Sequence, residues 1–442
     1  MNKSSRDVMT FKGGIHPVDG GKALSEHAEV RTPPIFENYQ VLLCENVGKV
    51  PKPVVKVGDR VLKYQLIAAA DGFVSANLHA PTSGTVSMIG EVPGPMGVPA
   101  PAVCITADGL DEAVELPPPI SDWKSADKET LIGRIAECGL VGMGGASFPT
   151  HVKLLPPSDK KVDALILNGA ECEPYLTADH RLMLERPRDV VEGAAIMGRI
   201  LGVSDVSIGV EVNKGDAIAA LEAVAEEFSV KIVPLKVRYP QGSEKHLIKA
   251  IAGREVPSGG LPADAGCVVQ NVGTAAACSD AVLRGLPLVE RIVTVTGEVV
   301  RNPGNWKLRI GTPALEAIRL AGGVTEEPGK IIFGGPMMGF AQRSTEVPVA
   351  KNTSGILLLS REVALRHRSG HCIRCGRCLQ GCPMHLSPCL LATAIEHGRW
   401  DLAKQNHVMD CIECGACAYV CPAHRPLVQL MRSAKMELRK RK

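Results

Sequence analysis

Eight cysteines near the carboxyl end of the chain have the spacing of iron–sulfur ligands. The pattern Cys-x2-Cys-x2-Cys-x3-Cys-Pro occurs twice, as Cys372, Cys375, Cys378 and Cys382 and again as Cys411, Cys414, Cys417 and Cys421. Two-residue gaps let one tight loop turn three thiolates toward the same iron–sulfur cube, whereas the fourth thiolate points toward the other cube. The spacing therefore predicts one-electron transfer by two [4Fe-4S] clusters.

The fourth cysteine of each run assigns the thiols to clusters, as in two-cluster bacterial ferredoxins. We predict that cluster 1 is held by Cys372, Cys375, Cys378 and Cys421. Cluster 2 is then held by Cys411, Cys414, Cys417 and Cys382. Cys389 falls outside this register, which indicates a buried thiol rather than a ligand.

Structural zinc and a disulfide framework are the two alternatives for these cysteines. Zinc sites usually have two Cys pairs separated by a longer spacer, and lack the Cys-Pro ending. Disulfide scaffolds are typical of small secreted chains. This chain has 442 residues, and its first twelve have no apolar signal segment. Both alternatives are therefore disfavoured.

A second candidate site is a glycine-rich loop at residues 139–150. Its four glycines, at positions 139, 142, 144 and 145, let backbone NH groups approach a ligand where a Cβ would collide. A phosphate or ring cradle and an ordinary turn both fit this loop, and a preceding helix excludes the dinucleotide fingerprint. Asn168, Glu171 and Glu173 follow an apolar strand. They could bind an isoalloxazine edge and ribityl or ribose hydroxyls, or form a solvated strand exit.

Four regions of different pattern must position these sites. Residues 38–115 have short β patterns typical of a lipoyl-like barrel-sandwich hybrid, but no carrier lysine occurs between Lys63 and Lys124. Residues 126–285 alternate helical and strand patterns, which predicts an α/β domain with a mainly parallel sheet. Residues 290–345 predict a β-grasp unit, and residues 360–430 a helical domain around the cluster loops.

Composition limits the function classes. A net charge of +3 is too small to indicate nucleic-acid binding by bulk electrostatic attraction. No apolar run approaches the roughly 18 residues of a membrane-spanning helix, and we expect a cytoplasmic protein. Residues 1–37 form an N-terminal extension. Residues 431–442 form a basic tail that we expect to be solvated, with contact to a membrane surface or an acidic partner as the alternative.

The glycine loop resembles the flavin loop Gly-Arg-Gly-Gly-Ala-Gly-Phe-Pro of the NADH-binding flavoprotein subunit of respiratory NADH dehydrogenase. The similar stretch is Gly142 to Thr150, followed by Lys153. Residues 168–174 are similar to the Asn-Ala-Asp-Glu-Ser-Glu-Pro segment of that family. Residues 239–244 and 271–274 resemble its loop at the nucleotide site and its Asn-Val-Glu-Thr segment at the flavin phosphate.

The order of the regions resembles a closer family, the C subunits of Rnf (also Rsx) electron transport complexes, over essentially the full chain. That order is a barrel-sandwich hybrid, an α/β flavin domain, an SLBB-type β-grasp module and a two-[4Fe-4S] ferredoxin-like domain. The resemblance implies noncovalent FMN and NADH as substrate. The binding residues it implies are Gly142, Gly144, Gly145, Ala146, Phe148, Lys153, Asn168, Glu171, Glu173, Gly242, Glu244, Asn271 and Thr274.

Three residues depart from the respiratory pattern. Met143 stands where that family has Arg, Ala170 where it has Asp and Ser243 where it has Glu. These departures concern the contacts with NADH more than the presence of flavin.

The resemblance further implies a peripheral, NADH-oxidising subunit on the cytoplasmic side of the cell membrane. Its complex would be an ion-translocating NADH:ferredoxin oxidoreductase with integral membrane and other redox subunits, and with ferredoxin or flavodoxin as ultimate acceptor or donor. Nicotinamide delivers two electrons as hydride and a cluster takes one, so a flavin is needed between them, and no general base is required. The choice between sodium and proton resides in membrane partners outside this chain.

Two other functions are compatible with the same residues. One is a noncatalytic ferredoxin-like electron-transfer subunit, in which the glycine loop is only structural. The other is a quinone or other oxidoreductase with a vestigial flavin domain.

Overall fold

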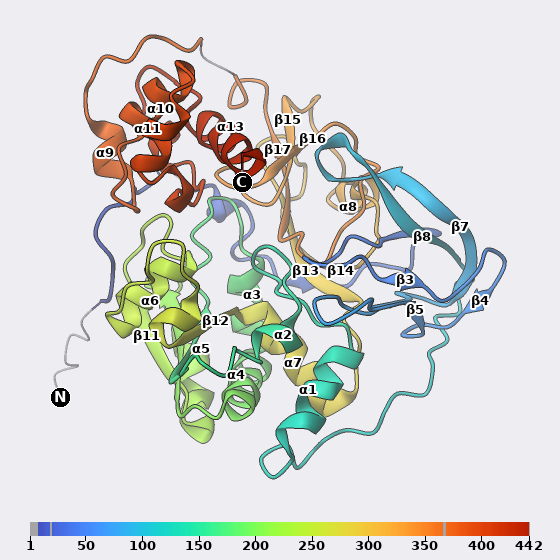
Figure 1. Ribbon diagram of the computed structural model, residues 1–442. Coiled ribbons are helices and arrows are strands. Elements are labelled where there is room, and N and C mark those ends of the chain that lie inside the picture. The colour runs from blue at the N-terminus through green and yellow to red at the C-terminus, as the bar shows by residue number, and fades with distance from the viewer. Residues whose placement is uncertain (1–7, 18–19, 366–367, 442) are drawn as a thin grey trace.

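Two small antiparallel sheets form a barrel-sandwich unit in the computed structural model, which describes residues 8–17, 20–365 and 368–441 (Figure 1). One sheet has the order β2, β8, β7, β4, with bounds Asn38–Leu42, Pro99–Ala107, Gly84–Pro93 and Arg60–Val61. The other has the order β3, β5, β6, with bounds Lys52–Pro53, Leu66–Ala69 and Leu78–His79. Val41, Ile67 and Val103 face inward and form the core, which confirms the predicted barrel-sandwich fold.

A four-stranded parallel sheet forms the centre of the α/β domain. Its order is β11, β10, β9, β12, with bounds Lys231–Leu235, Asp205–Glu211, Ala164–Asn168 and Cys267–Asn271. The strands are nearly continuous apolar runs because helices cover both faces of the sheet. From β9 the chain moves outward through β10 and β11, and then returns to place β12 on the other side of β9. The strand order therefore reverses between β9 and β12.

Helices cover this sheet unequally. On one face Leu165 and Leu167 pack in a core with α1 (Lys128–Glu137), α3 (Ala178–Glu185), α4 (Pro187–Leu201), α5 (Gly215–Ala225) and α7 (Val272–Arg284). On the other face Ala164 and Ile166 pack against α6 (Glu244–Ala252). The longest of these helices, α4, has 15 residues. Throughout the described ranges, no helix combines the length and apolar character needed to cross a membrane.

A six-stranded mixed sheet with α8 (Ala314–Leu320) forms the β-grasp domain. Its order is β1, β14, β13, β17, β15, β16, with bounds Val30–Arg31, Gly304–Arg309, Glu290–Thr296, Gly355–Leu359, Lys330–Phe333 and Phe340–Gln342. Strand β17 is central, because it pairs with both β13 and β15. The sheet therefore extends beyond the predicted range of 290–345 at both ends. The apolar run of β17 is the sequence signal for this extension.

The N-terminal segment is a part of the fold rather than a separate extension. Met9 pairs with Leu235 at the end of β11, Ile15 pairs with Tyr239, and β1 joins the β-grasp sheet beside β14. Residues 1–7 and 18–19 of the predicted extension lie outside the described residues. Such pairing is not visible in the sequence, because the paired stretches are only one or two residues long.

Five helices enclose the cluster loops. They are α9 (Arg377–Gly381), α10 (Pro388–Glu396), α11 (Trp400–Gln405), α12 (Ala416–Tyr419) and α13 (Leu427–Lys440). In Figure 1 this domain lies next to the α/β domain and far from the barrel-sandwich unit.

The basic tail predicted at residues 431–442 is largely the end of α13. Met431, Ala434 and Leu438 on this helix face the core of the cluster domain. Lys435 is also buried, and its ammonium pairs with Glu413 at 2.8 Å. The expectation of a solvated tail is therefore wrong for Lys435, because the helix is amphipathic, whereas Arg439, Lys440 and Arg441 are exposed as expected. Lys442 lies outside the described residues.

A buried polar network joins three parts of the chain around Asn305. The Asn305 amide nitrogen donates to the carbonyls of Ser25, at 2.9 Å, and Ala28, at 3.3 Å. Its amide oxygen accepts from the hydroxyls of Thr294, at 2.9 Å, and Thr177, at 3.1 Å. One fully satisfied side chain thus fixes the N-terminal segment and the α/β domain against the β-grasp sheet.

Replacing Asn305 with Ala is expected to lower the free energy of unfolding by about 1–3 kcal/mol, because buried hydroxyls and carbonyls lose their partner. Calorimetric unfolding of the purified chain measures the effect. Asn38→Ala removes an acceptor on the exposed surface and serves as the control, with an expected change under about 0.5 kcal/mol. Equal losses in the two variants would contradict the structural role of Asn305.

Candidate functional site

Two asparagines mark the carboxyl edge of the parallel sheet at the point where its strand order reverses. Asn168 ends β9, Asn271 ends β12, and the two residues are paired in register. In open α/β sheets, ligands bind in the crevice outside the carboxyl ends of the strands at this switch point. The predicted loop residues 168–174 and 271–274 therefore meet where a ligand is expected.

The glycine loop lies against this edge. The Met143 amide donates to the Thr274 hydroxyl at 3.0 Å, which joins the loop to the first turn of α7. A Cβ on Gly144 would lie 2.8 Å from the Asn271 amide nitrogen, so this position requires glycine. A Cβ on Gly145 would meet nothing within 4 Å, and residues 144–146 are exposed. The loop thus combines a tight contact with the sheet and an open outer side.

Asn271 is held in place by a half-buried carboxyl group, that of Asp179, which the sequence analysis missed. Its side-chain oxygen caps α7 by accepting from the Gly273 amide, and its side-chain nitrogen donates to Asp179 at 2.7 Å. Burial, together with the nearby Glu171 carboxylate, raises the pKa of Asp179 to about 6. The Arg291 guanidinium, also buried, donates to the Met143 carbonyl at 3.2 Å. The sequence did contain one signal for this contact, because Arg291 is a charged residue within the apolar strand β13.

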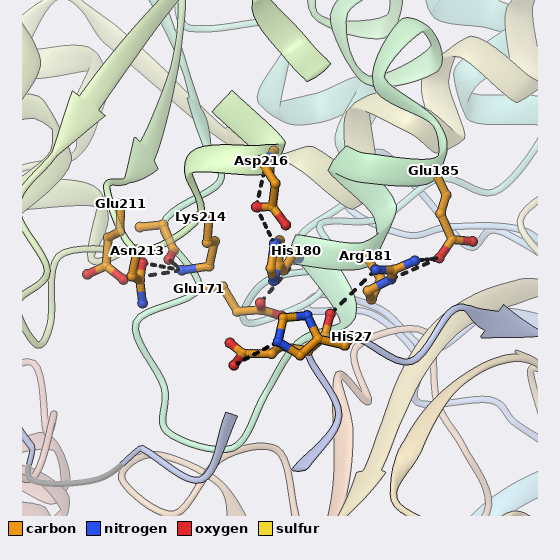
Figure 2. Close-up of polar contacts among 12 residues, drawn as sticks. His27, Glu171, His180, Arg181, Glu185, Glu211, Asn213, Lys214 and Asp216 are labelled. Atoms are coloured by element: carbon orange, nitrogen blue, oxygen red, sulfur yellow. Dashed lines mark hydrogen bonds and ion pairs between the residues drawn. The ribbon is translucent and has the colours of Figure 1, made fainter. Parts of the chain in front are cut away.

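Glu171 caps a helix in this structure. Its carboxylate accepts from the backbone amides of Asp179, at 2.8 Å, and His180, at 3.2 Å, in the first turn of α3. A carboxylate is favourable there because a helix N-terminus carries partial positive charge. Next to it, the buried Lys214 ammonium donates to the Ala170 carbonyl at 2.7 Å and pairs with Glu211 (Figure 2). The loop after β9 is therefore held by its own Glu171, which binds α3, and by Lys214, which binds its backbone.

The remaining predicted residues of the α/β domain meet across the same crevice. The Asn168 amide nitrogen donates to the Gly242 carbonyl at 2.8 Å, and Lys153 forms an ion pair with Glu244. The Phe148 carbonyl accepts from the Gly142 amide at 2.9 Å and closes the glycine loop. Four segments that are distant in sequence are thus brought together.

Two buried polar side chains beside the crevice fit a polar ligand. Gln241 is fully buried, and both of its amide atoms lack a hydrogen-bond partner among the described residues. The Thr150 hydroxyl, at the end of the glycine loop, is likewise buried and unpartnered within the described part of the chain. Buried polar groups without partners are uncommon in native proteins and call for an explanation. With the open space at Gly145, they fit a flavin with its many hydrogen-bonding atoms.

Glu173 is directed toward another domain. Its carboxylate accepts from the amides of Met337, at 3.0 Å, and Met338, at 2.8 Å, between β15 and β16. Burial raises the pKa of this carboxyl to about 7. Both oxygens are engaged by the β-grasp domain, so the structure gives Glu173 the role of a link between domains.

A shared core joins the crevice to the second cysteine loop. Tyr239 is buried and its hydroxyl donates to the Cys414 carbonyl at 2.7 Å. Cys172, in the loop after β9, accepts from the Gly242 amide at 3.3 Å and packs in the same core as Tyr239 and Cys414. No other hydrophobic core described for this chain contains residues of both the α/β domain and the cluster loops.

The four thiols predicted for cluster 2 line a single cavity in the cluster domain: Cys382, Cys411, Cys414 and Cys417. In the described residues, no three Cys, His, Asp or Glu side chains are placed to hold a metal ion directly. These two observations agree, because a cube keeps its thiolates apart, whereas a single zinc ion needs all its sulfurs at about 2.3 Å. The cavity therefore fits a cluster, and the ligand assignment remains a prediction.

The thiols predicted for cluster 1 lie closer to the surface. Cys372 and Cys375 are exposed, Cys378 is buried and Cys421 is half-buried. The Gly370 amide donates to the Ala423 carbonyl at 2.9 Å, which brings the two cysteine loops side by side. Cys389 is half-buried at the start of α10 and packs against the core that contains Cys378.

A ligand edge on a parallel sheet beside two cysteine loops is the arrangement expected of an iron–sulfur flavoprotein. Four family models match the chain along its length. They are the RnfC barrel sandwich hybrid domain at residues 9–110, the Nuo51 FMN-binding domain at 135–280, the SLBB domain at 292–341 and the 4Fe-4S dicluster domain at 364–422. The predicted FMN and iron–sulfur cofactors and the predicted fold are confirmed by these matches.

Curated relatives are similar over nearly the full chain. The chain is 50% identical to the C subunit of the proton-translocating ferredoxin:NAD(+) oxidoreductase complex of Clostridium ljungdahlii, covering 98% of this chain and 94% of the relative. It is 46% identical to the C subunit of the Na(+)-translocating complex of Acetobacterium woodii, covering 97% of each. The chain belongs to this family, the C subunits of Rnf-type ion-translocating oxidoreductase complexes. The predicted family is confirmed.

Solved structures show the same fold at low identity. The NAD+-reducing [NiFe]-hydrogenase in its H2-reduced state has a chain that matches with a TM-score of 0.51 and 18% identity. The match covers 73% of this chain and 63% of the hydrogenase chain.

Replacing a glycine of the loop with alanine tests whether the loop binds FMN. Gly144→Ala should release most of the FMN and also lower the melting temperature of the flavin-free protein, because its Cβ displaces Asn271. Gly145→Ala should release FMN without that destabilisation, because only the ligand space is filled. Flavin fluorescence and calorimetry give the two readouts. Gly133→Ala on α1, whose Cβ also meets nothing within 4 Å, is the control. FMN retained in both loop variants would exclude this loop as the cradle.

The cysteine assignment predicts different iron contents for two neighbouring variants. Cys382→Ala should reduce the iron from about eight to about four per chain, since it removes a ligand of one cube. Cys389→Ala should keep about eight. Iron and sulfide analysis of anaerobically purified protein measures both, and a loss of iron in the Cys389 variant would make that thiol a ligand.

Proposed function

We propose that this chain exchanges electrons between NADH, FMN and two [4Fe-4S] clusters as the NADH-oxidising subunit of its complex. The observation that carries the proposal is the buried contact between Tyr239 and Cys414, which joins the flavin crevice to the cysteine loop of cluster 2. The names of the relatives support the reaction class, because they describe ferredoxin:NAD(+) oxidoreductase complexes.

The residues of the crevice would bind and orient rather than transfer protons. Residues 142–148, Asn168, Asn271 and Thr274 would hold FMN, and Lys153 with Glu244 would lie at the nicotinamide or phosphate side. FMN held there would accept the two electrons of one hydride and release them singly, which is the conversion that the clusters require. The buried Arg291 and the half-buried Asp179 would keep the glycine loop and Asn271 rigid, so the binding site would be formed in advance of binding.

We also propose a cellular setting for the subunit. We place it at the periphery of the cell membrane, on the cytoplasmic side, with integral membrane and other redox subunits as partners. Ferredoxin or flavodoxin would be the ultimate acceptor or donor. The names of two relatives, with proton and sodium translocation, support an ion-coupled complex.

Anaerobic reduction by NADH tests the proposal. The absorption of both FMN and the clusters should bleach on addition of NADH, and in Gly144→Ala the clusters should stay oxidised with NADH yet still bleach with dithionite. Electron paramagnetic resonance confirms that the clusters are intact in both proteins. Cluster reduction by NADH in protein free of FMN would overturn the catalytic role. Failure of NADH to reduce FMN-loaded protein would favour a noncatalytic role in electron transfer.

A further inference from the structure

The segment that carries three ligands of cluster 1 is basic. Between Glu362 and Glu396 the sequence has no Asp or Glu, but has four arginines and three histidines. Of the arginines, Arg368, Arg374 and Arg377 are described, and all three are exposed. The chain as a whole is nearly neutral, with a net charge of +3, so this run is a local concentration of positive charge.

The positive charges beside cluster 1 are available to another molecule. Within the described ranges, Arg374 and Arg377 take part in no ion pair or side-chain hydrogen bond. The loop of cluster 2 differs, because Glu413 there pairs with Arg432 at 2.9 Å and Lys435 at 2.8 Å. Near cluster 1 the buried Arg425 pairs with Glu396, but Arg374 and Arg377 of the cysteine loop itself have no such acidic partner among the described residues.

The two cysteine loops also differ in what covers them. Cys414 of the cluster 2 loop is buried and bound to Tyr239 of the α/β domain. Cys372 and Cys375 of the cluster 1 loop are exposed, and Ile373 between them has 68% of its surface exposed. In Figure 1 the helix that follows this loop, α9, lies at the outer side of the domain. Cluster 2 thus faces the flavin domain and cluster 1 faces outward.

From these observations we infer that residues 371–377 form a docking surface for the acidic face of an iron–sulfur partner protein, which exchanges single electrons with cluster 1. The inference rests on the proposed function. In the exchange, cluster 1 loses one electron and the partner's cluster gains it, or the reverse, and no bond or proton moves. Unpaired arginines around an exposed apolar residue suit a protein face, since charge complementarity steers the encounter and a small apolar contact fixes the position.

Association of the full, cluster-loaded chain with an acidic two-[4Fe-4S] ferredoxin tests the surface. Arg374→Glu with Arg377→Glu should weaken binding by about tenfold or more and abolish most of its salt dependence, as charge reversal at a steering surface does. Lys56→Glu with Lys161→Glu changes the net charge equally at exposed positions outside the cluster domain, and should leave binding within about twofold. Biolayer interferometry at low and high salt measures affinity, and electron paramagnetic resonance verifies both clusters.

Two outcomes would overturn the inference. One is equal weakening by the loop variant and the lysine control, which would mean that only net charge matters. The other is a loop variant that binds ferredoxin normally but loses binding to vesicles containing anionic lipid, which would make the loop a membrane contact. Where charge reversal disturbs the clusters, Arg374→Gln with Arg377→Gln replaces it, with a smaller loss expected. NADH reduction without ferredoxin is measured separately, so failure of the proposed function is distinguishable from failure of the docking surface.

Discussion

The hydrogen bond from the Tyr239 hydroxyl to the Cys414 carbonyl is the contact on which the arrangement of the redox sites depends. It is buried, so the bond excludes water and holds the cysteine loop against the α/β domain. The same contact is supported from the other side by Ile15, whose backbone pairs with that of Tyr239. A crevice for a two-electron carrier and a loop for one-electron carriers are thereby kept in a fixed relation.

Buried charged groups also form hydrogen bonds between domains. The Lys351 ammonium donates to the carbonyls of Asn77, at 3.0 Å, and Gly139, at 2.7 Å, and its backbone amide donates to the Glu45 carboxylate. Burial lowers the pKa of Lys351, while it raises that of Glu45. Such groups are costly to bury and give little net stability, but the hydrogen bonds they make form only in a single arrangement of the domains. They therefore specify the arrangement that the glycine loop and the sheet edge require.

The parts of the fold and site that could be predicted have local signals, such as the apolar runs of the parallel sheet and the Cys-x2-Cys steps. The resemblance supplied the crevice residues, but it included Glu171 and Glu173, whose carboxylates bind backbone amides of α3 and of the loop between β15 and β16. Local sequence cannot tell such carboxylates from ligand-binding ones. Asp179 binds Asn271, and Arg291 binds the glycine loop. Both were missed because these partners are distant in the sequence. Strand β1 was missed for the same reason, whereas the apolar run of β17 was a local signal that the predicted boundary left out.

The asymmetry of the two cysteine loops follows from their surroundings, because their cysteine patterns are the same. One loop is covered by the α/β domain and has its acidic residue neutralised by Arg432 and Lys435 of α13. The other precedes α9 in a stretch without acidic residues and with two exposed thiols. Identical cysteine patterns are thus placed in surroundings of different exposure and local charge. Exposure and charge are two of the factors that set the reduction potential of a cluster. In the proposed electron path, the buried cysteine loop would be the inner station and the exposed loop the outer one.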